Sequence, residues 1–212
     1  MKLSPKDITA KEKTNEQKLE ASVAQVVPIE DANDLENRGV IFISDVITRE
    51  SLNTPIKKIL SLQFEEKFTD SIQIIISSPG GELAATWAFI DIMESSRLNI
   101  RTIAVGEVSS GAAMIFIAGD QRIMTPNSTA MFHHLSTFSG GTYPDLLAAR
   151  KKEDLETKKI LNHILHNSKY TSIKQVTDNI LLPTDNWLTP KEMKKHGLCD
   201  IILKSRRTKR KK

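Results

Sequence analysis

The pattern that most restricts the fold is an apolar run followed by a glycine-containing turn and a helical stretch, and it occurs twice. The first copy covers residues 72–95 and the second covers 100–118. In each copy, β-branched residues precede the turn and apolar side chains follow it. Strands that alternate with helices in this way predict βαβ units and a mainly parallel sheet. We therefore expect an α/β protein in which such units can build a spiral.

Similar patterns extend this framework on both sides. The sequence predicts further strands at 40–43, 122–124, 129–132 and 201–203, and helices at 48–63, 143–169, 172–180 and 189–196. Polar and apolar residues alternate so little in the run at 72–77 that we expect both faces of this strand to be buried. Residues 1–37 are polar and are predicted to be a flexible or partner-ordered arm, 38–204 the folded domain, and 205–212 a basic tail.

Composition and charge exclude several classes of protein. Of the 212 residues, 39% are hydrophobic and 26% are charged, which is typical of a globular domain. The net charge of +4 comes from the last eight residues, because without their six Lys and Arg the chain has 24 basic against 26 acidic residues. Nucleic-acid binding is therefore not expected.

The apolar segments and the cysteine content bear on the expected cellular location. There is no apolar leader and no run of about 18 apolar residues, so neither a signal peptide nor a membrane span is predicted. The single cysteine, Cys199, cannot form an internal disulfide and is interpreted as a small buried residue. A reducing cytoplasmic location is expected.

The two predicted turns carry residues that suit acyl transfer. Strand-to-helix turns of a parallel sheet gather at the carboxyl ends of the strands, where ligands bind. One turn ends at Gly81, and the other contains Ser109, Ser110 and Gly111. A serine there could act as a nucleophile, and the N–H groups of Gly81 and Gly111 could stabilise an oxyanion.

A general base could come from His133 or His134, which follow a predicted strand, and strand alternation lets only one of them face the serine. Other interpretations remain open. A serine before an apolar helix is commonly a helix cap, and a histidine is commonly structural. His163 and His166 are three residues apart on a helix but have no evident third metal ligand, so they are expected to be surface residues.

Five motifs in order resemble the proteolytic subunit of the Clp protease over residues 38–204. They are Arg38-Gly-Val-Ile-Phe-Ile43, Ile76-Ser-Ser-Pro-Gly-Gly81, Gly106-Glu-Val-Ser-Ser-Gly-Ala-Ala113, Pro126-Asn-Ser-Thr-Ala-Met-Phe-His133, and Trp187-Leu-Thr-Pro-Lys-Glu-Met-Lys-Lys-His-Gly-Leu-Cys-Asp200. The resemblance implies a ClpP/crotonase-like spiral of βαβ units with a long handle helix. It also implies that Ser110 is the nucleophile and His133 the base, with Gly81 and Gly111 as oxyanion donors.

The third member of the family's triad is not fixed by this resemblance. Ungapped alignment puts Leu181 at the family's aspartate, whereas matching the helix pattern puts Asn179 there, beside Asp178, and Asp185 is a further candidate. A carboxylate at this place orients the imidazole and stabilises the imidazolium. The resemblance therefore implies reduced activity if no carboxylate reaches His133.

The family's architecture is implied as well. Such subunits form heptameric rings, stacked in pairs through the long helix, and an ATP-dependent AAA+ unfoldase feeds unfolded polypeptides into the chamber. ATP is used by that partner, and no cofactor is implied for this chain. Residues 139–142 would offer an edge to which a substrate adds as a strand.

Two alternatives of different classes stay open. The chain could be a non-catalytic or weakly active ring subunit. It could also be a crotonase-type acyl-CoA hydratase or isomerase, for which Glu107 is the candidate acid/base residue. A Ser–Lys peptidase is disfavoured because no lysine is well placed.

Overall fold

The computed structural model describes residues 32–65 and 71–205, and the fold discussed below belongs to the unit Leu35–Lys212. Within the segment predicted to be a flexible arm, Ala32–Asn37 forms a short helix, α2. The rest of that arm and residues 206–212 of the predicted tail lie outside the described residues, so these two predictions stay predictions.

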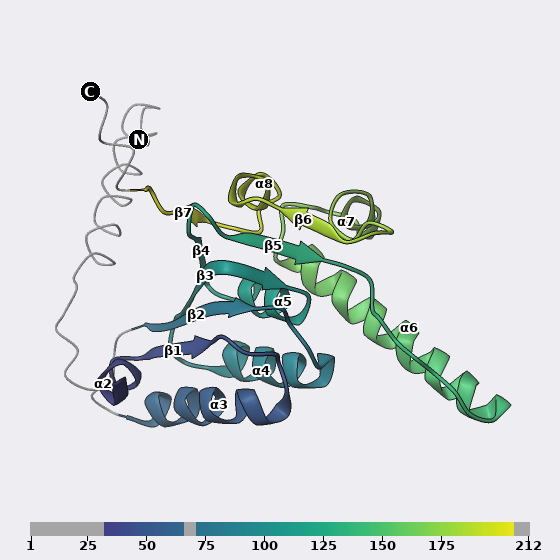
Figure 1. Ribbon diagram of the computed structural model, residues 1–212, viewed down its shortest axis with the longest axis horizontal. Helices are drawn as coiled ribbons and strands as arrows, with labels where there is room; N and C mark the ends of the chain where they lie inside the picture. The colour runs from purple at the N-terminus through teal and green to yellow at the C-terminus, as the bar shows by residue number, and fades with distance from the viewer. Residues whose placement is uncertain (1–31, 66–70, 206–212) are drawn as a thin grey trace, which may run out of the picture. The chain divides into compact units, whose positions relative to one another are not determined.

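Strands and helices alternate along the described chain, as the sequence predicts (Figure 1). The strands are β1 (Val40–Ile43), β2 (Ile72–Ser78), β3 (Ile100–Ser109), β4 (Gln121–Met124), β5 (Thr129–Phe132), β6 (Asn186–Leu188) and β7 (Ile201–Ile202). The other helices are α3 (Arg49–Phe64), α4 (Leu83–Ser95), α5 (Gly111–Ile117), α6 (Tyr143–His166), α7 (Ile173–Asn179) and α8 (Pro190–Lys195).

One sheet joins all these strands, and its centre is β3. Its order is β1-β2-β3-β4-β7, and β5 pairs with β3 and with β6. All pairs are parallel except β5 with β6. The first half of β3, residues 101–104, pairs with β4, whereas its second half, residues 107–109, pairs with β5. The sheet therefore divides at β3, and the second branch leads toward the predicted serine.

The core joins apolar residues of the sheet to those of α3, α4 and α5, and it extends to α6, α7 and α8. In β2 the buried residues alternate, so Ile72, Ile74 and Ile76 are fully buried while Gln73 and Ile75 are half-buried. The expectation that both faces of this strand are buried is thus wrong within the single chain. The run is apolar at Ile75 as well, which is why the sequence alone could not separate the two faces.

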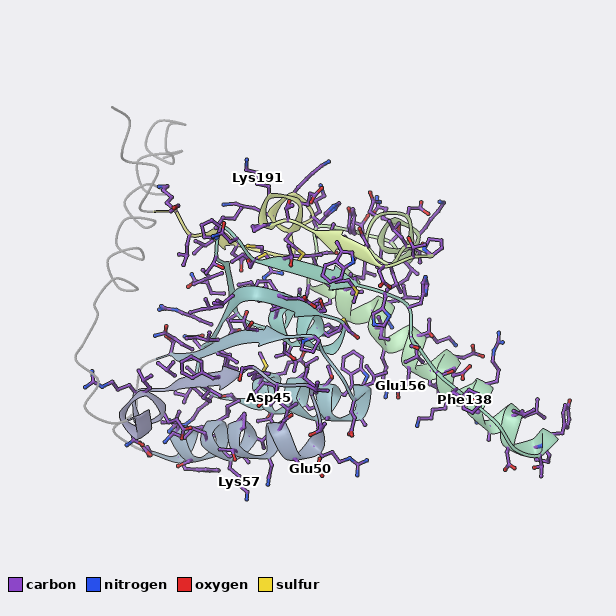
Figure 2. The ribbon with its side chains drawn as sticks, in the orientation of Figure 1. Asp45, Glu50, Lys57, Phe138, Glu156 and Lys191 are labelled. Atoms are coloured by element: carbon purple, nitrogen blue, oxygen red, sulfur yellow. The ribbon has the colours of Figure 1, made fainter. Side chains whose placement is uncertain are left out.

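The longest helix, α6, extends away from the sheet (Figure 1). It begins with a capping box in which Thr142 and Asp145 satisfy each other's backbone N–H groups. Its apolar side chains Leu146, Leu147 and Leu155 are exposed in the single chain. Figure 2 shows Phe138 beside the part of α6 that reaches outward, and this side chain is 99% exposed.

The structure differs from the sequence-based elements at three places. β3 continues through Gly106, where a turn was expected, because this glycine adopts a φ of +68° inside the strand. The short strand β6 was not predicted, since three residues carry too little pattern. Residues 133–142 form no strand in the described chain, so the expected edge at 139–142 is an irregular segment here.

Candidate active site

Ser110 lies at the junction between β3 and α5, in a strained conformation. Its φ of 56° makes it the one non-glycine residue with a positive φ among the described residues. Two backbone hydrogen bonds hold it there: its N–H donates to the Met131 carbonyl at 2.9 Å, and its carbonyl accepts from the Met114 N–H at 3.2 Å. Such strain costs of order 1–3 kcal/mol and clusters at functional sites. The turn thus presents the Ser110 hydroxyl at the start of a buried helix.

The pairing of β3 with β5 brings His133 to this serine. The Nε2 atom of His133 lies 2.7 Å from the Ser110 Oγ, which is hydrogen-bonding distance for a nucleophile and its base. The neighbouring side chains point elsewhere. Ser109 is buried and donates to the Glu107 carboxylate at 2.7 Å, and His134 is exposed.

A cavity of about 280 Å³ opens at the Ser110–His133 pair. Its apolar wall comes from six separate elements or loops and contains Leu83, Met114, Phe132, Leu135, Ile160, Ile164 and Leu181. Gly81, Gly111, Glu82 and Ser136 also line it. An apolar side chain of a ligand would fit this wall while its polar backbone faces the serine.

A second cavity of about 440 Å³ adjoins the first between the loop 135–139 and α6. The two cavities share Glu82, Leu83 and Leu135, and the second adds Phe138 and Glu153 to its lining. Hydrogen bonds from Thr137 and Ser139 lower the pKa of the Glu153 carboxyl. The loop is therefore tied to α6 by a carboxylate that stays charged.

Two glycines that line the first cavity have backbone N–H groups with no acceptor among the described residues. Gly81 and Gly111 both line it, and neither N–H donates to another group in the described residues. A side chain is excluded at both positions. A Cβ on Gly81 would lie 2.1 Å from the Ile47 carbonyl oxygen, and one on Gly111 would lie 2.4 Å from the Thr86 Oγ1. These free donors can stabilise negative charge beside Ser110.

The polar candidates for a third member of the site lie elsewhere. Asp178 pairs with the Lys174 ammonium, and Asn179 donates to the Gln175 carbonyl. Asp185 is exposed and does not line the cavity. Leu181, in contrast, is 2% exposed and lines the cavity together with His133. In the described part of the chain, no carboxylate therefore hydrogen-bonds to the His133 imidazole.

The structure also contradicts one prediction about the long helix. His163 is not a surface residue: its Nε2 hydrogen-bonds to the Met114 carbonyl at 3.0 Å, and its ring packs edge-on against Trp87. Burial lowers the pKa of His163, so the ring is neutral at pH 7. This contact joins α6 to α5, the helix that begins at Ser110. The spacing of the two histidines in the sequence could not predict this burial, because the residues that His163 contacts, Met114 and Trp87, are distant in sequence.

Other chemistries find little support in the described residues. No three His, Cys, Asp or Glu side chains in them gather closely enough to hold a metal ion. The interpretation of Cys199 as a small buried residue is confirmed, since it is 3% exposed, and burial raises the pKa of its thiol to about 11. No helix among the described ranges combines the length and apolar character that a membrane span needs.

Comparison with known proteins agrees with this fold. The family model of the Clp protease matches residues 24–206. The chain is 32% identical over 171 residues to the ATP-dependent Clp protease proteolytic subunit 1 of Rhodopirellula baltica, covering 80% of this chain and 73% of the relative. It is 31% identical over 172 residues to the subunit of the same name from Cutibacterium acnes, covering 78% and 77%. The chain therefore belongs to the Clp protease family, as the sequence motifs indicated.

The close contact between Gly111 and Thr86 predicts a coupled pair of substitutions. Gly111→Ala should destabilise the protein by about 1–3 kcal/mol, because the new methyl group would overlap the Thr86 hydroxyl. In a Thr86→Ala background the same change should cost far less. Urea unfolding of the two single variants and the double variant measures the coupling, and additive costs would contradict it.

The raised pKa of Cys199 predicts its reactivity. At pH 8 the folded protein should react with iodoacetamide about 100-fold more slowly than the urea-unfolded chain, because only the thiolate reacts. The unfolded thiol loses its proton first, so this group's contribution to the free energy of unfolding should fall as the pH rises from about 9 to 11. Cys199→Ala should lack this pH dependence, and equal alkylation rates in both states would refute the prediction.

Proposed function

We propose that this chain is a serine endopeptidase in which Ser110 is the nucleophile and His133 is its general base. The observation that carries the proposal is the 2.7 Å contact between the Ser110 Oγ and the His133 Nε2, in a cavity that Gly81 and Gly111 also line. A serine hydroxyl becomes nucleophilic when an adjacent base takes its proton. Membership of the Clp protease family supports peptide bonds as the target.

Acylation follows from this arrangement. The Ser110 Oγ attacks the scissile carbonyl carbon while its proton moves to the His133 Nε2, and a tetrahedral oxyanion forms. The N–H groups of Gly81 and Gly111 would donate to that oxygen. The imidazolium then gives its proton to the leaving nitrogen, the C–N bond breaks, and an acyl-serine remains.

Deacylation reuses the same groups. A water molecule attacks the acyl carbon as His133 takes one of its protons, and a second oxyanion forms in the same place. When this intermediate collapses, the bond to the Ser110 Oγ breaks and the serine recovers its proton from His133. No cofactor enters either step of the proposed reaction.

Unfolded polypeptide is the proposed substrate. The irregular segment 133–142 runs past both cavities, and a peptide lying along it in an extended conformation would place one side chain in the apolar cavity. The relatives are named as proteolytic subunits of an ATP-dependent protease, which supports feeding by an ATP-dependent AAA+ unfoldase that would hydrolyse the ATP itself.

We further propose that the chain works in heptameric rings stacked in pairs. Exposed apolar side chains on α6 and at Phe138 suit burial against another subunit. Ring closure needs head-to-tail contacts, in which different surfaces of one subunit meet. A cytoplasmic location and the absence of nucleic-acid binding remain predictions of the sequence.

One alternative keeps a specific observation in its favour. A non-catalytic or weakly active ring subunit would fit the lack of a carboxylate partner for His133 in the described residues. The crotonase-type alternative is not favoured by the family, and its candidate acid, Glu107, accepts from Ser109 and does not line the cavity.

A fluorophosphonate probe tests the proposed chemistry directly. Labelling should map to Ser110, disappear in Ser110→Ala, and slow by about 100-fold in His133→Ala, because the base no longer removes the serine proton. The rate at which the complete assembly hydrolyses an unfolded protein should change in the same way: it should be lost in Ser110→Ala and strongly reduced in His133→Ala.

The chain offers matched controls for this experiment. Ser109→Ala and His134→Ala change the same residue types one position away, and their side chains point away from the pair. Both should label at close to the normal rate. An assembled protein that takes no label would instead favour the non-catalytic subunit.

Native mass spectrometry tests the proposed assembly. A subunit mass of 23.7 kDa predicts particles of about seven and fourteen times that value. Leu146→Glu with Leu155→Glu on α6 should reduce the larger species to the smaller one, because charge would then line the face that stacks. A strictly monomeric protein would be inconsistent with a ring chamber.

A further inference from the structure

The imidazole of His133 has a partner on only one of its two nitrogens. Its Nε2 contacts the Ser110 Oγ, but its Nδ1 has no hydrogen bond to any of the described residues. In a serine hydrolase, an acceptor at the second nitrogen fixes the tautomer and the ring orientation and stabilises the imidazolium. The question is which residue stands at the place from which such an acceptor would act.

Contacts at the end of α7 hold Leu181 against this part of the site. The Leu181 N–H donates to the Val176 carbonyl, and the carbonyls of Asn179 and Ile180 both accept from the Asn186 side chain. Asn186 in β6 pairs with Phe132, the residue before His133. The backbone at 179–180 is thereby linked, through Asn186, to the strand that ends just before His133.

Leu181 belongs to the apolar wall of the cavity that the Ser110–His133 pair also lines. It is 2% exposed and lines the cavity with Ser110 and His133, whereas the next residue, Leu182, does not line it. The nearby polar residues cannot take this role without moving, because Asp178 and Asn179 have their own partners.

We propose that Leu181 is the positioning residue of this site: it restrains His133 by packing alone, and position 181 sets the reactivity of Ser110. This inference rests on the proposed peptidase function. A leucine can limit the motion of the ring, but it neither accepts a hydrogen bond nor offsets the charge of an imidazolium. The site is therefore a Ser–His dyad whose reactivity a carboxylate at position 181 would raise.

The size of the expected effect follows from known triads. Replacing the orienting carboxylate of a triad by its amide lowers turnover by about 10⁴-fold. Because the surroundings of Leu181 are apolar, an introduced aspartate would also be partly desolvated, which opposes its charged form. We therefore expect Leu181→Asp to raise the rate of Ser110 labelling by about 10- to 100-fold rather than by the full factor.

The experiment compares four full-length proteins with the fluorophosphonate probe: the unchanged chain, Leu181→Asp, Leu181→Asn and Leu182→Asp. Only Leu181→Asp should label Ser110 faster by tenfold or more. Leu181→Asn has the same size without the charge, and Leu182→Asp puts the same charge one position away. The acid limb of the pH–rate profile should also move to higher pH in Leu181→Asp, because a negative charge favours the protonated ring.

A second variant covers the case in which Leu181→Asp fails to fold. Leu181→Ala should open space beside the ring, and added formate should then accelerate labelling in proportion to its concentration. The unchanged chain should not respond to formate, since its leucine fills that space. Labelling in every case should be absent when Ser110→Ala is also present.

The outcomes separate this inference from the proposed function. If the unchanged chain labels at Ser110 but neither the folded aspartate variant nor formate increases the rate, the inference about position 181 is wrong and the peptidase proposal stands. If only Leu181→Asp labels, the inference holds and the natural chain is a non-catalytic subunit. If no protein labels at Ser110, both proposals fail.

Discussion

The pairing of the second half of β3 with β5 is the interaction on which the candidate site depends. Glu107, Val108 and Ser109 pair in register with Thr129, Ala130 and Met131 of β5, and the Ser110 N–H continues the ladder to the Met131 carbonyl. This register carries Ser110 and His133 to the same end of two adjacent strands. A shift of one residue would turn His133 to the other face and bring His134 forward instead.

The strained turn at Ser110 persists because close packing leaves it no alternative. On one side, a Cβ at Gly80 would lie 2.5 Å from the Ser109 carbonyl oxygen, and on the other the Gly111 position meets Thr86. Every residue of α5 is buried, so a shift of the helix that relaxed the turn would disturb its packing in the core. His163 adds a bond from α6 to the Met114 carbonyl of this same helix. The handle helix and the reactive turn are thus parts of one packed unit.

Much of this fold could be predicted from the sequence. The β-branched runs predicted β1 and β2, and the helix expected at 48–63 is α3, whose first turn Thr48 caps. The failures have physical reasons. β3 runs through Gly106 because a glycine can hold a positive φ inside a strand, and β6 is too short to produce a pattern. His163 was misplaced because its partners lie in α4 and α5, far away in sequence.

The sequence by itself determined most of the order of strands and helices, the glycine turn that ends at Gly81, and the family, and through the family it singled out Ser110 and His133. Local chemistry could not choose between Ser109 and Ser110, or between the two histidines, because the members of each pair differ only in the direction in which their side chains point. The tertiary structure decided those directions through the β3–β5 register. It also decided what surrounds His133: Asp178 and Asn179 have other partners, and Leu181 lines the cavity. That environment depends on contacts between segments about 50 residues apart in sequence, for which a one-dimensional pattern carries no signal.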